Sequence, residues 1–214
     1  MKTFFFDVGG TLLGAKSLFG EIMCALGLPE KGEARDDFTQ TFISLKSGVG
    51  EDFLDMRSLL VNSARSLEGK WNLQDFTPQC IETIYEDIFK NHSWVIPDVR
   101  DVLTQIQSLG IRMVVASDAD ADVLLHGLKK FELYDFFDGF IISSEVRAYK
   151  PSDIFVNCIG EKYPFSRENS FFVGDTRDDM VTSRKLGIQG ILMGDNDPSA
   201  QGDFHFNNFV DLCS

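Results

Sequence analysis

Residues 3–12 read Thr3-Phe4-Phe5-Phe6-Asp7-Val8-Gly9-Gly10-Thr11-Leu12. A short apolar run that ends in a polar residue and a pair of glycines predicts a buried strand followed by a tight turn. Ligands of parallel α/β sheets bind beyond the carboxyl ends of the strands, so the residue that follows this strand is expected at the ligand-binding edge. We therefore predict that Asp7 is a fixed carboxylate at that edge.

The rest of the chain alternates between apolar runs and helical periodicity. One helix is predicted to end at Gly110, and its apolar positions are Val99, Val102, Leu103, Ile106 and Leu109. The later strands are predicted at 112–116, 140–142, 171–174 and 190–193, and the helices between them near 121–131, 152–162 and 178–186. This alternation is typical of the α/β class, in which a doubly wound parallel sheet is covered by helices on both faces.

The first two predicted strands are separated by far more residues than a crossover needs, which is about a dozen. Within this gap apolar residues recur at helical spacing, which predicts a bundle of about four helices. We therefore expect a core domain of residues 1–14 and 92–214 and a folded α-helical lid of residues 15–91. The apolar positions of the lid are Leu18, Phe19, Ile22 and Met23, then Phe38, Phe42 and Ile43, then Phe53, Met56, Leu60 and Ala64, and finally Ile81, Ile84, Tyr85 and Ile88.

The charge balance argues against several classes of partner. The 214 residues include 20 Lys and Arg against 33 Asp and Glu, a net charge of -13. So acidic a chain repels a phosphate backbone, and no nucleic acid is expected as a partner. No stretch approaches the roughly 18 uninterrupted apolar residues of a membrane span, and Met1 is not followed by the features of a secretory signal. We expect a cytoplasmic protein without a membrane partner.

Cysteine and histidine form no recognisable site in the sequence. The four cysteines are Cys24, Cys80, Cys158 and Cys213. They lack the close spacing of a zinc site or a redox dithiol, and we interpret them as reduced thiols of the core. The three histidines are equally scattered, which argues against a histidine-dependent catalytic triad.

The loop after the first strand has the residue types of a phosphate site. A carboxylate at the end of a rigid buried strand, here Asp7, could attack phosphorus. Gly9 and Gly10 allow the backbone to turn tightly and approach a ligand, while the hydroxyl and N–H of Thr11 could donate to phosphate oxygens. The alternative is that Asp7 only caps the following turn.

Two later segments carry further candidates for binding an anion. Ser117 and Asp118 follow the strand at 112–116, where a hydroxyl and a helix N-terminus could hold a phosphate oxygen. Lys150 stands directly before Pro151, which is predicted to open a helix, and its ammonium could neutralise phosphate charge. The alternatives are a simple N-cap at Ser117 and a solvated surface lysine.

The strand predicted at 171–174 ends in an acidic segment that contains Asp175, Asp178 and Asp179. Hard oxygen ligands suit Mg²⁺, and Asp7, Asp175 and Asp179 together would supply several of them. Capping carboxylates in a strand-to-helix turn would explain Asp178 or Asp179 but not Asp175. Carboxylates packed together without a cation repel one another, which favours a metal site.

These segments resemble, in their order and spacing, the sequence motifs of the haloacid dehalogenase (HAD) superfamily, and the resemblance covers nearly the whole chain. It implies that Asp7 is the catalytic nucleophile and that Ser117 and Lys150 hold the phosphate. The candidate substrate-binding residues are Gly10, Thr11, Ser117, Asp118 and Lys150.

The same resemblance implies the metal site and the role of the insertion. Asp7, Asp175 and the carbonyl of Gly9 would ligate Mg²⁺, with Asp179 as a further or water-mediated ligand. The insertion after the first motif resembles the helical cap of the phosphoglycolate phosphatase and β-phosphoglucomutase branch. Such a cap would close over the substrate and select its leaving group.

The sequence departs from the family pattern at Gly9, where phosphatases of the superfamily usually have a second Asp. That carboxyl normally acts as the general acid and base, a role worth about two to four orders of magnitude in rate. Asp118 is a candidate substitute. A smaller departure is Arg147, where relatives usually have Gly.

The resemblance predicts a Mg²⁺-dependent phosphatase that acts on a small phosphorylated metabolite through an aspartyl-phosphate. Related dehalogenases and phosphonatases also lack the second Asp, so cleavage of a carbon–halogen or carbon–phosphorus bond is an alternative. Asp175 and Asp179 argue against a dehalogenase, because carbon substitution needs no metal. A phosphonatase needs a lysine that forms a Schiff base, and the sequence does not assign this role to Lys46 or Lys70. A third alternative is a protein that binds a phosphorylated ligand or a partner without turnover.

Overall fold

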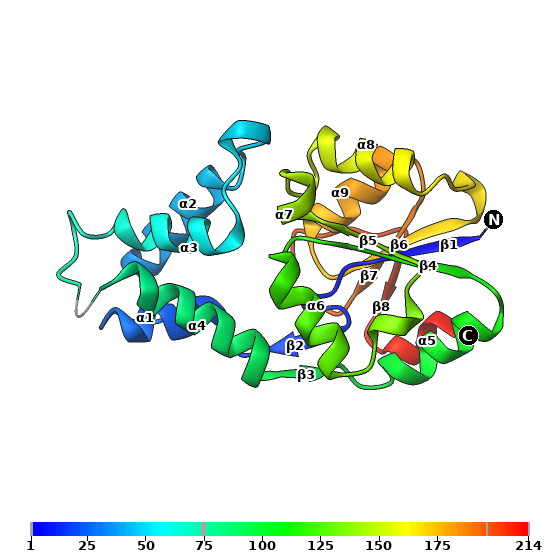
Figure 1. Ribbon diagram of the computed structural model, residues 1–214, viewed down its shortest axis with the longest axis horizontal. Helices are drawn as coiled ribbons and strands as arrows, with labels where there is room; N and C mark the ends of the chain where they lie inside the picture. The colour runs from blue at the N-terminus through cyan, green and yellow to red at the C-terminus, as the bar shows by residue number, and fades with distance from the viewer. Residues whose placement is uncertain (1, 74–75, 196, 214) are drawn as a thin grey trace. The chain divides into compact units, whose positions relative to one another are not determined.

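The computed structural model describes residues 2–73, 76–195 and 197–213. The chain divides into two compact units, one of Met1–Gly14 with Trp94–Ser214 and the other of Ala15–Ser93. Figure 1 shows the helices and strands of both units. The chain crosses between the units at two points, where β2 (Leu13–Ala15) and β3 (Ser93–Val95) pair as a two-stranded sheet.

The first unit contains a six-stranded sheet in the order β5-β4-β1-β6-β7-β8, and all of its pairs are parallel. The strands are β1 (Thr3–Phe6), β4 (Arg112–Ser117), β5 (Gly139–Ile142), β6 (Ser170–Gly174), β7 (Gln189–Met193) and β8 (Phe204–Phe206). The predicted parallel α/β sheet is confirmed. The sequence analysis missed β8, because three residues are too few to show a periodicity.

The strand order reverses beside β1. From β1 the chain proceeds through β4 to the edge strand β5, then returns to the other side of β1 with β6 and continues outward through β7 to β8. Phe6 of β1 pairs with Val173 of β6, so the two strands end side by side. Ligands of open α/β sheets bind where the strand order reverses, beyond the carboxyl ends of the strands.

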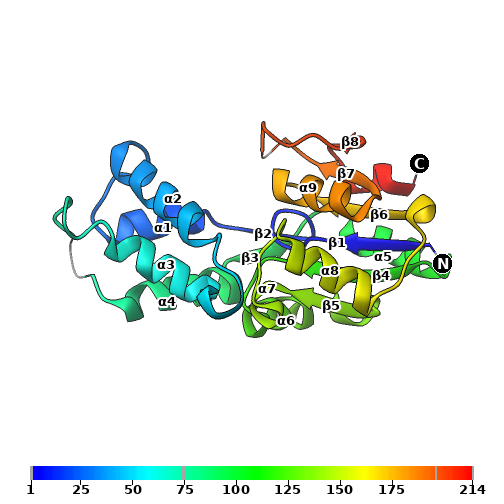
Figure 2. The same cartoon turned by 90° about the horizontal axis from the view of Figure 1, so that it is seen from above.

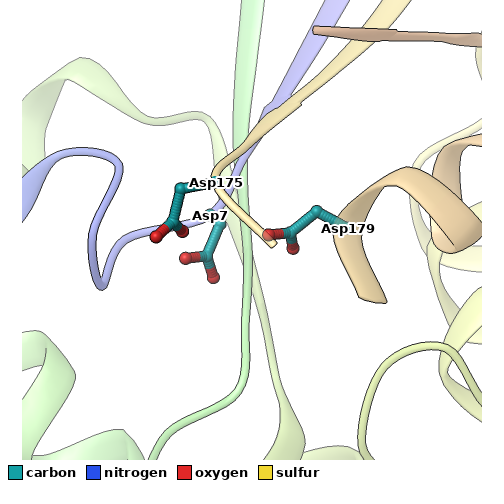
Figure 3. Close-up of side chains that lie close together, drawn as sticks. All are labelled: Asp7, Asp175 and Asp179. Carbon is teal, nitrogen blue, oxygen red and sulfur yellow. The ribbon is translucent and has the colours of Figure 1, made fainter. Parts of the chain in front are cut away.

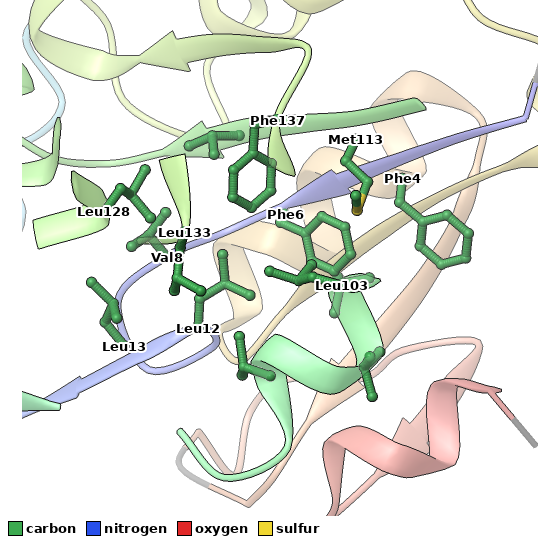
Figure 4. Close-up of a cluster of buried hydrophobic side chains, with 14 of the residues drawn as sticks. Phe4, Phe6, Val8, Leu12, Leu13, Leu103, Met113, Leu128, Leu133 and Phe137 are labelled. Carbon is green, nitrogen blue, oxygen red and sulfur yellow. The ribbon is translucent and has the colours of Figure 1, made fainter. Parts of the chain in front are cut away.

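The phenylalanines of β1 supply apolar packing to both faces of the sheet, because successive side chains of a strand point to opposite sides. Phe4 and Phe6 belong to the cluster that packs against α5 (Val99–Ser108) and α6 (Ala121–Lys130), part of which is drawn in Figure 4. Phe5 belongs to a second cluster, which contains apolar residues of α8 (Asp153–Lys162) and α9 (Arg177–Leu186). Helices therefore cover both faces, as predicted. Figure 2 shows this first unit from above.

Three details of the core helices differ from the sequence expectations. Leu109 is the C-cap of α5 and is 72% exposed, so it does not continue the apolar face. Pro151 does not open α8, because the side chain of Ser152 caps that helix by accepting from the N–H of Phe155 at 3.3 Å. The short helix α7 (Ser143–Val146) was missed, and its C-cap, Arg147, has φ 57°, a left-handed conformation that glycine adopts at lower cost.

The second unit has four α-helices in its described residues, together with the short 3-10 helix η1 (Gly50–Asp52). They are α1 (Leu18–Ala25), α2 (Glu33–Leu45), α3 (Met56–Arg65) and α4 (Pro78–Asn91). Ser17, Asp55 and Thr77 cap the first, third and fourth helices by accepting from backbone N–H groups. Phe53 is buried but follows η1 outside a helix, and Ile43 is 64% exposed, so the two do not belong to buried helical faces as expected.

No helix in the described part of the chain is long and apolar enough to cross a membrane.

Candidate active site

Three buried carboxylates from distant parts of the sequence meet at the carboxyl edge of the sheet. Asp7 follows β1, Asp175 follows β6, and Asp179 lies in the first turn of α9. One oxygen from each lies within 4.8 Å of the others. Figure 3 shows their carboxyl groups close together beyond the ends of the strands. The predicted convergence of these three acids is thus observed.

Two glycines make room for these carboxylates. Gly10 has φ 79°, and a Cβ there would lie 2.1 Å from Oδ2 of Asp175. A Cβ on Gly174 would lie 2.4 Å from Cγ of Asp179. Either contact is far shorter than two non-bonded atoms tolerate, so a side chain at these positions would displace an acidic group.

Lys150 is the buried counter-charge of the cluster. Its ammonium donates to Oδ1 of Asp7 at 2.7 Å, to Oδ1 of Asp179 at 2.6 Å and to the carbonyl of Ala116 at 3.2 Å. The side chain is only 3% exposed, which excludes the solvated surface lysine considered from the sequence. Asp118 holds the backbone of this residue, because its Oδ1 accepts from the N–H of Lys150 at 2.9 Å.

Asp179 is positioned by a capping box at the start of α9. The Thr176 hydroxyl accepts from the Asp179 N–H at 3.3 Å and donates to its Oδ2 at 2.6 Å, while the Thr176 N–H donates to the same oxygen at 3.0 Å. The sequence analysis missed Thr176. The spacing of Thr176 and Asp179 ahead of a helix resembles the capping-box pattern and was the available signal.

The electrostatics of the cluster are unfavourable for carboxylates alone. Burial raises the pKa of Asp7 to about 7; Lys150 opposes this rise, and the charges of Asp179 and Asp175 add to it. Burial also disfavours the charge of Lys150, but the surrounding carboxylates Asp179, Asp7 and Asp118 outweigh it and raise the pKa of this lysine. Lys150 therefore stays protonated, and Asp7, with a pKa of about 7, is only partly ionised at neutral pH.

The donor set of the cluster fits a hard divalent cation. When ionised, three carboxylates outnumber the single ammonium of Lys150, and burial, with the charges of Asp179 and Asp175, raises the pKa of Asp7 despite this lysine. The three carboxylates offer oxygen ligands, the type that Mg²⁺ prefers over nitrogen and sulfur.

The family model of haloacid dehalogenase-like hydrolases matches residues 5–193. The chain belongs to this family. It is 22% identical over 219 residues to a phosphoglycolate phosphatase of Photorhabdus laumondii, a match that covers 98% of this chain and 89% of that protein. It is 26% identical over 129 residues to PpaX of Caldanaerobacter subterraneus, which is named as a pyrophosphatase; that match covers 60% of this chain and 57% of PpaX.

The structure of the HAD-hydrolase YfnB from Bacillus subtilis, bound to magnesium, has the same fold. It superimposes with a TM-score of 0.76 at 16% identity, and the match covers 99% of this chain and 96% of YfnB. The predicted HAD fold and the prediction of a hydrolase are therefore confirmed.

The other predicted site residues of this HAD-like hydrolase lie around the same edge. Thr11 is buried, and its hydroxyl donates to Oδ1 of Asp175 at 3.3 Å. Ser117 is buried at the end of β4 and does not cap the next helix, since Asp120 is the N-cap of α6. Gly9 is exposed two residues after Asp7, and a Cβ there would have no atom within 4 Å.

The three cysteines whose side chains the structure describes take no part in the acidic cluster. Cys24, Cys80 and Cys158 are free thiols, and Cys24 is exposed, so the expectation of core thiols is wrong for that residue. The side chain of Cys213 lies outside the described part of the structure.

Proposed function

We propose that this HAD-like hydrolase is a Mg²⁺-dependent phosphatase that acts on a small phosphorylated metabolite through an aspartyl-phosphate at Asp7. One observation carries the proposal: Asp7 is a buried carboxylate at the point where the strand order reverses, in direct contact with the ammonium of Lys150 and within 4.8 Å of two further acids. A phosphoryl group would find there a nucleophile, a fixed cation and ligands for a metal. The names of the relatives as phosphatases and as a pyrophosphatase agree with this chemistry.

Mg²⁺ would be held by Asp7, Asp175 and the carbonyl of Gly9, with Asp179 as a further or water-mediated ligand. When bound, it would neutralise phosphate oxygens and so reduce their repulsion of the Asp7 carboxylate. Lys150 keeps its proton and orients Asp7 through the 2.7 Å hydrogen bond. The oxygen of Asp7 that does not accept this bond attacks phosphorus.

The remaining phosphate contacts would come from the loops beside Asp7. The hydroxyl of Ser117 and the backbone N–H groups of Gly10 and Thr11 are the candidate donors to phosphate oxygens. Asp118 positions Lys150 through the backbone contact at 2.9 Å. The helical unit, residues 15–91 in the sequence prediction, would act as the cap that excludes water and selects the substrate.

A phosphonatase is less well supported. A Schiff base needs a neutral amine, but the hydrogen bonds that Lys70 donates to Asp37 and Glu33 raise the pKa of this lysine and favour its protonated form. The amine of Lys70 lies 2.8 Å from Oδ2 of Asp37 and 2.5 Å from Oε1 of Glu33.

The test is hydrolysis of a panel of phosphate monoesters and anhydrides with Mg²⁺ or with EDTA. We expect Mg²⁺-dependent release of phosphate, and a loss of at least about a thousandfold in Asp7→Asn, since removal of a nucleophile removes the covalent route. Asp153→Asn, on an exposed side chain that is 84% accessible, is the matched control and should retain activity. Turnover that survives EDTA or Asp7→Asn would exclude the proposed mechanism.

A further inference from the structure

The hydrogen bonds around Asp7 engage Lys150 and Asp179 with other groups of the core unit. All three protons of the Lys150 ammonium have acceptors, namely Asp7, Asp179 and the carbonyl of Ala116. One oxygen of Asp179 accepts from Lys150, and the other accepts from the N–H and the hydroxyl of Thr176. The hydrogen bonds of Lys150 and Asp179 therefore link them to each other and to neighbouring groups of the site.

The other acids near Asp7 are also engaged. Asp175 accepts from the hydroxyl of Thr11 and packs against Gly10, while Asp118 accepts from the backbone N–H of Lys150. Each of these acids accepts a hydrogen bond that holds another part of the site. Among the described residues around Asp7, these acids thus already serve to position Thr11 and Lys150.

Gly9 has no side chain, although the structure has room there for one that could donate a proton. This glycine lies two residues after Asp7, beside the turn in which the N–H of Thr11 donates to the carbonyl of Val8, and it is exposed. A Cβ would have no atom within 4 Å, and the backbone is outside the left-handed region. Steric conflict therefore does not account for the absence of a carboxyl group.

We infer that the substrates are phosphoryl anhydrides, such as acyl phosphates, whose leaving groups are stable anions, and that alkyl phosphate esters are poor substrates. This inference rests on the proposed function and specifies its substrate class. An alkoxide is strongly basic and needs a proton as it departs, whereas a carboxylate does not.

The bond changes balance without an acid. The Asp7 oxygen bonds to phosphorus while the bond from phosphorus to the leaving oxygen breaks, and the leaving group departs with the electron pair as an anion. Water then bonds to phosphorus, the bond to Asp7 breaks, and the carboxylate recovers its electron pair. The protons of the water pass to the phosphate product and the solvent.

Acetyl phosphate and ethyl phosphate are the probes, because they match in carbon number and differ in the leaving group. The variants are Gly9→Asp and, as a matched control for added charge, Gly69→Asp, where a Cβ also has no atom within 4 Å. After subtraction of spontaneous hydrolysis, we expect wild type and Gly69→Asp to have a much higher kcat/KM for acetyl phosphate than for ethyl phosphate. Gly9→Asp should reduce that preference by about 100- to 10,000-fold through a gain on ethyl phosphate.

The outcomes separate the two proposals. Turnover of neither probe by the wild type, with no phosphate label on Asp7, would count against the proposed function itself. Comparable kcat/KM for both probes in the wild type would leave the phosphatase proposal standing and overturn the inference about the leaving group. A Gly9→Asp variant that keeps acetyl phosphate turnover but gains nothing on ethyl phosphate would overturn it too.

Discussion

Asp7 is buried with two other carboxylates around it, and a single ammonium, that of Lys150, lies among them. Burial raises the pKa of Asp7 to about 7 from the usual 3.8, so the group resists ionisation although a nucleophile must be ionised. A divalent cation would remove this conflict, because its charge favours the ionised form of every ligand. Metal binding would thus lower the free-energy cost of ionising the buried Asp7.

This pKa makes the metal-free protein sensitive to pH. Between about pH 4 and pH 7 the folded protein keeps a proton on Asp7 that the unfolded chain has lost. Because the native state binds more protons in this window, its stability falls as the pH rises. We expect Asp7→Asn to gain stability relative to wild type between pH 5 and pH 8, on the order of a few kcal/mol.

Urea unfolding in EDTA at the two pH values measures this difference. Asp153→Asn, on an exposed acid, is the control and should show no such change with pH. If the free energies of unfolding of Asp7→Asn and wild type differ by the same amount at pH 5 and at pH 8, Asp7 has an ordinary pKa and the prediction is wrong.

The acids and the lysine of the site were predictable from sequence, whereas their partners were not. Asp7 and Asp175 each follow an apolar run, and Lys150 precedes a proline, so the residue order indicates them. The carbonyl of Ala116, which accepts from Lys150 at 3.2 Å, has no signal of this kind, since any residue supplies a carbonyl. Such contacts depend on how the strands are ordered in the sheet.

The turn from β6 to α9 combines two functions in one short segment. Gly174 leaves space for the carboxyl of Asp179, and Thr176 both caps the helix and holds that carboxyl. The same acid therefore belongs to a capping box and to the acidic cluster, so a capping role does not exclude Asp179 from the proposed metal site.

Removal of the capping hydroxyl tests this combination. Thr176→Ala should lower the free energy of unfolding by about 1–2 kcal/mol, because the Asp179 N–H loses its acceptor and Oδ2 loses a donor. Thr176→Ser keeps the hydroxyl and should stay within about 0.5 kcal/mol of wild type. Urea unfolding at neutral pH distinguishes the variants, and equal losses in Ala and Ser would assign the effect to the methyl group instead.

The elements that were predicted well are the longer and more regular ones. The strand expected at 112–116 is observed at Arg112–Ser117, and the helix expected at 178–186 is observed at Arg177–Leu186. The strands and the helix that were missed are short: β2, β3 and β8 have three residues each, and α7 has four. Segments this short depend on tertiary pairing and carry too few residues for a period to appear.

The strand order of the whole sheet is what brings the site together. The sequence predicts parallel strands and helices on both faces, but it does not specify that β6 returns to lie beside β1. That return places the ends of the two strands next to each other and lets Asp175 and Asp7 converge. The fold class was thus accessible from local patterns, and the strand order was accessible only through the family resemblance.

The most direct test of the proposed site is a crystal structure with Mn²⁺ in place of Mg²⁺, grown near pH 8 so that Asp7 is ionised. We expect an anomalous peak of Mn²⁺ within coordination distance of the carboxylates of Asp7 and Asp175, and its loss when excess Mg²⁺ competes. An ordered Mn²⁺ bound elsewhere, with these two carboxylates left without an ion, would contradict the account.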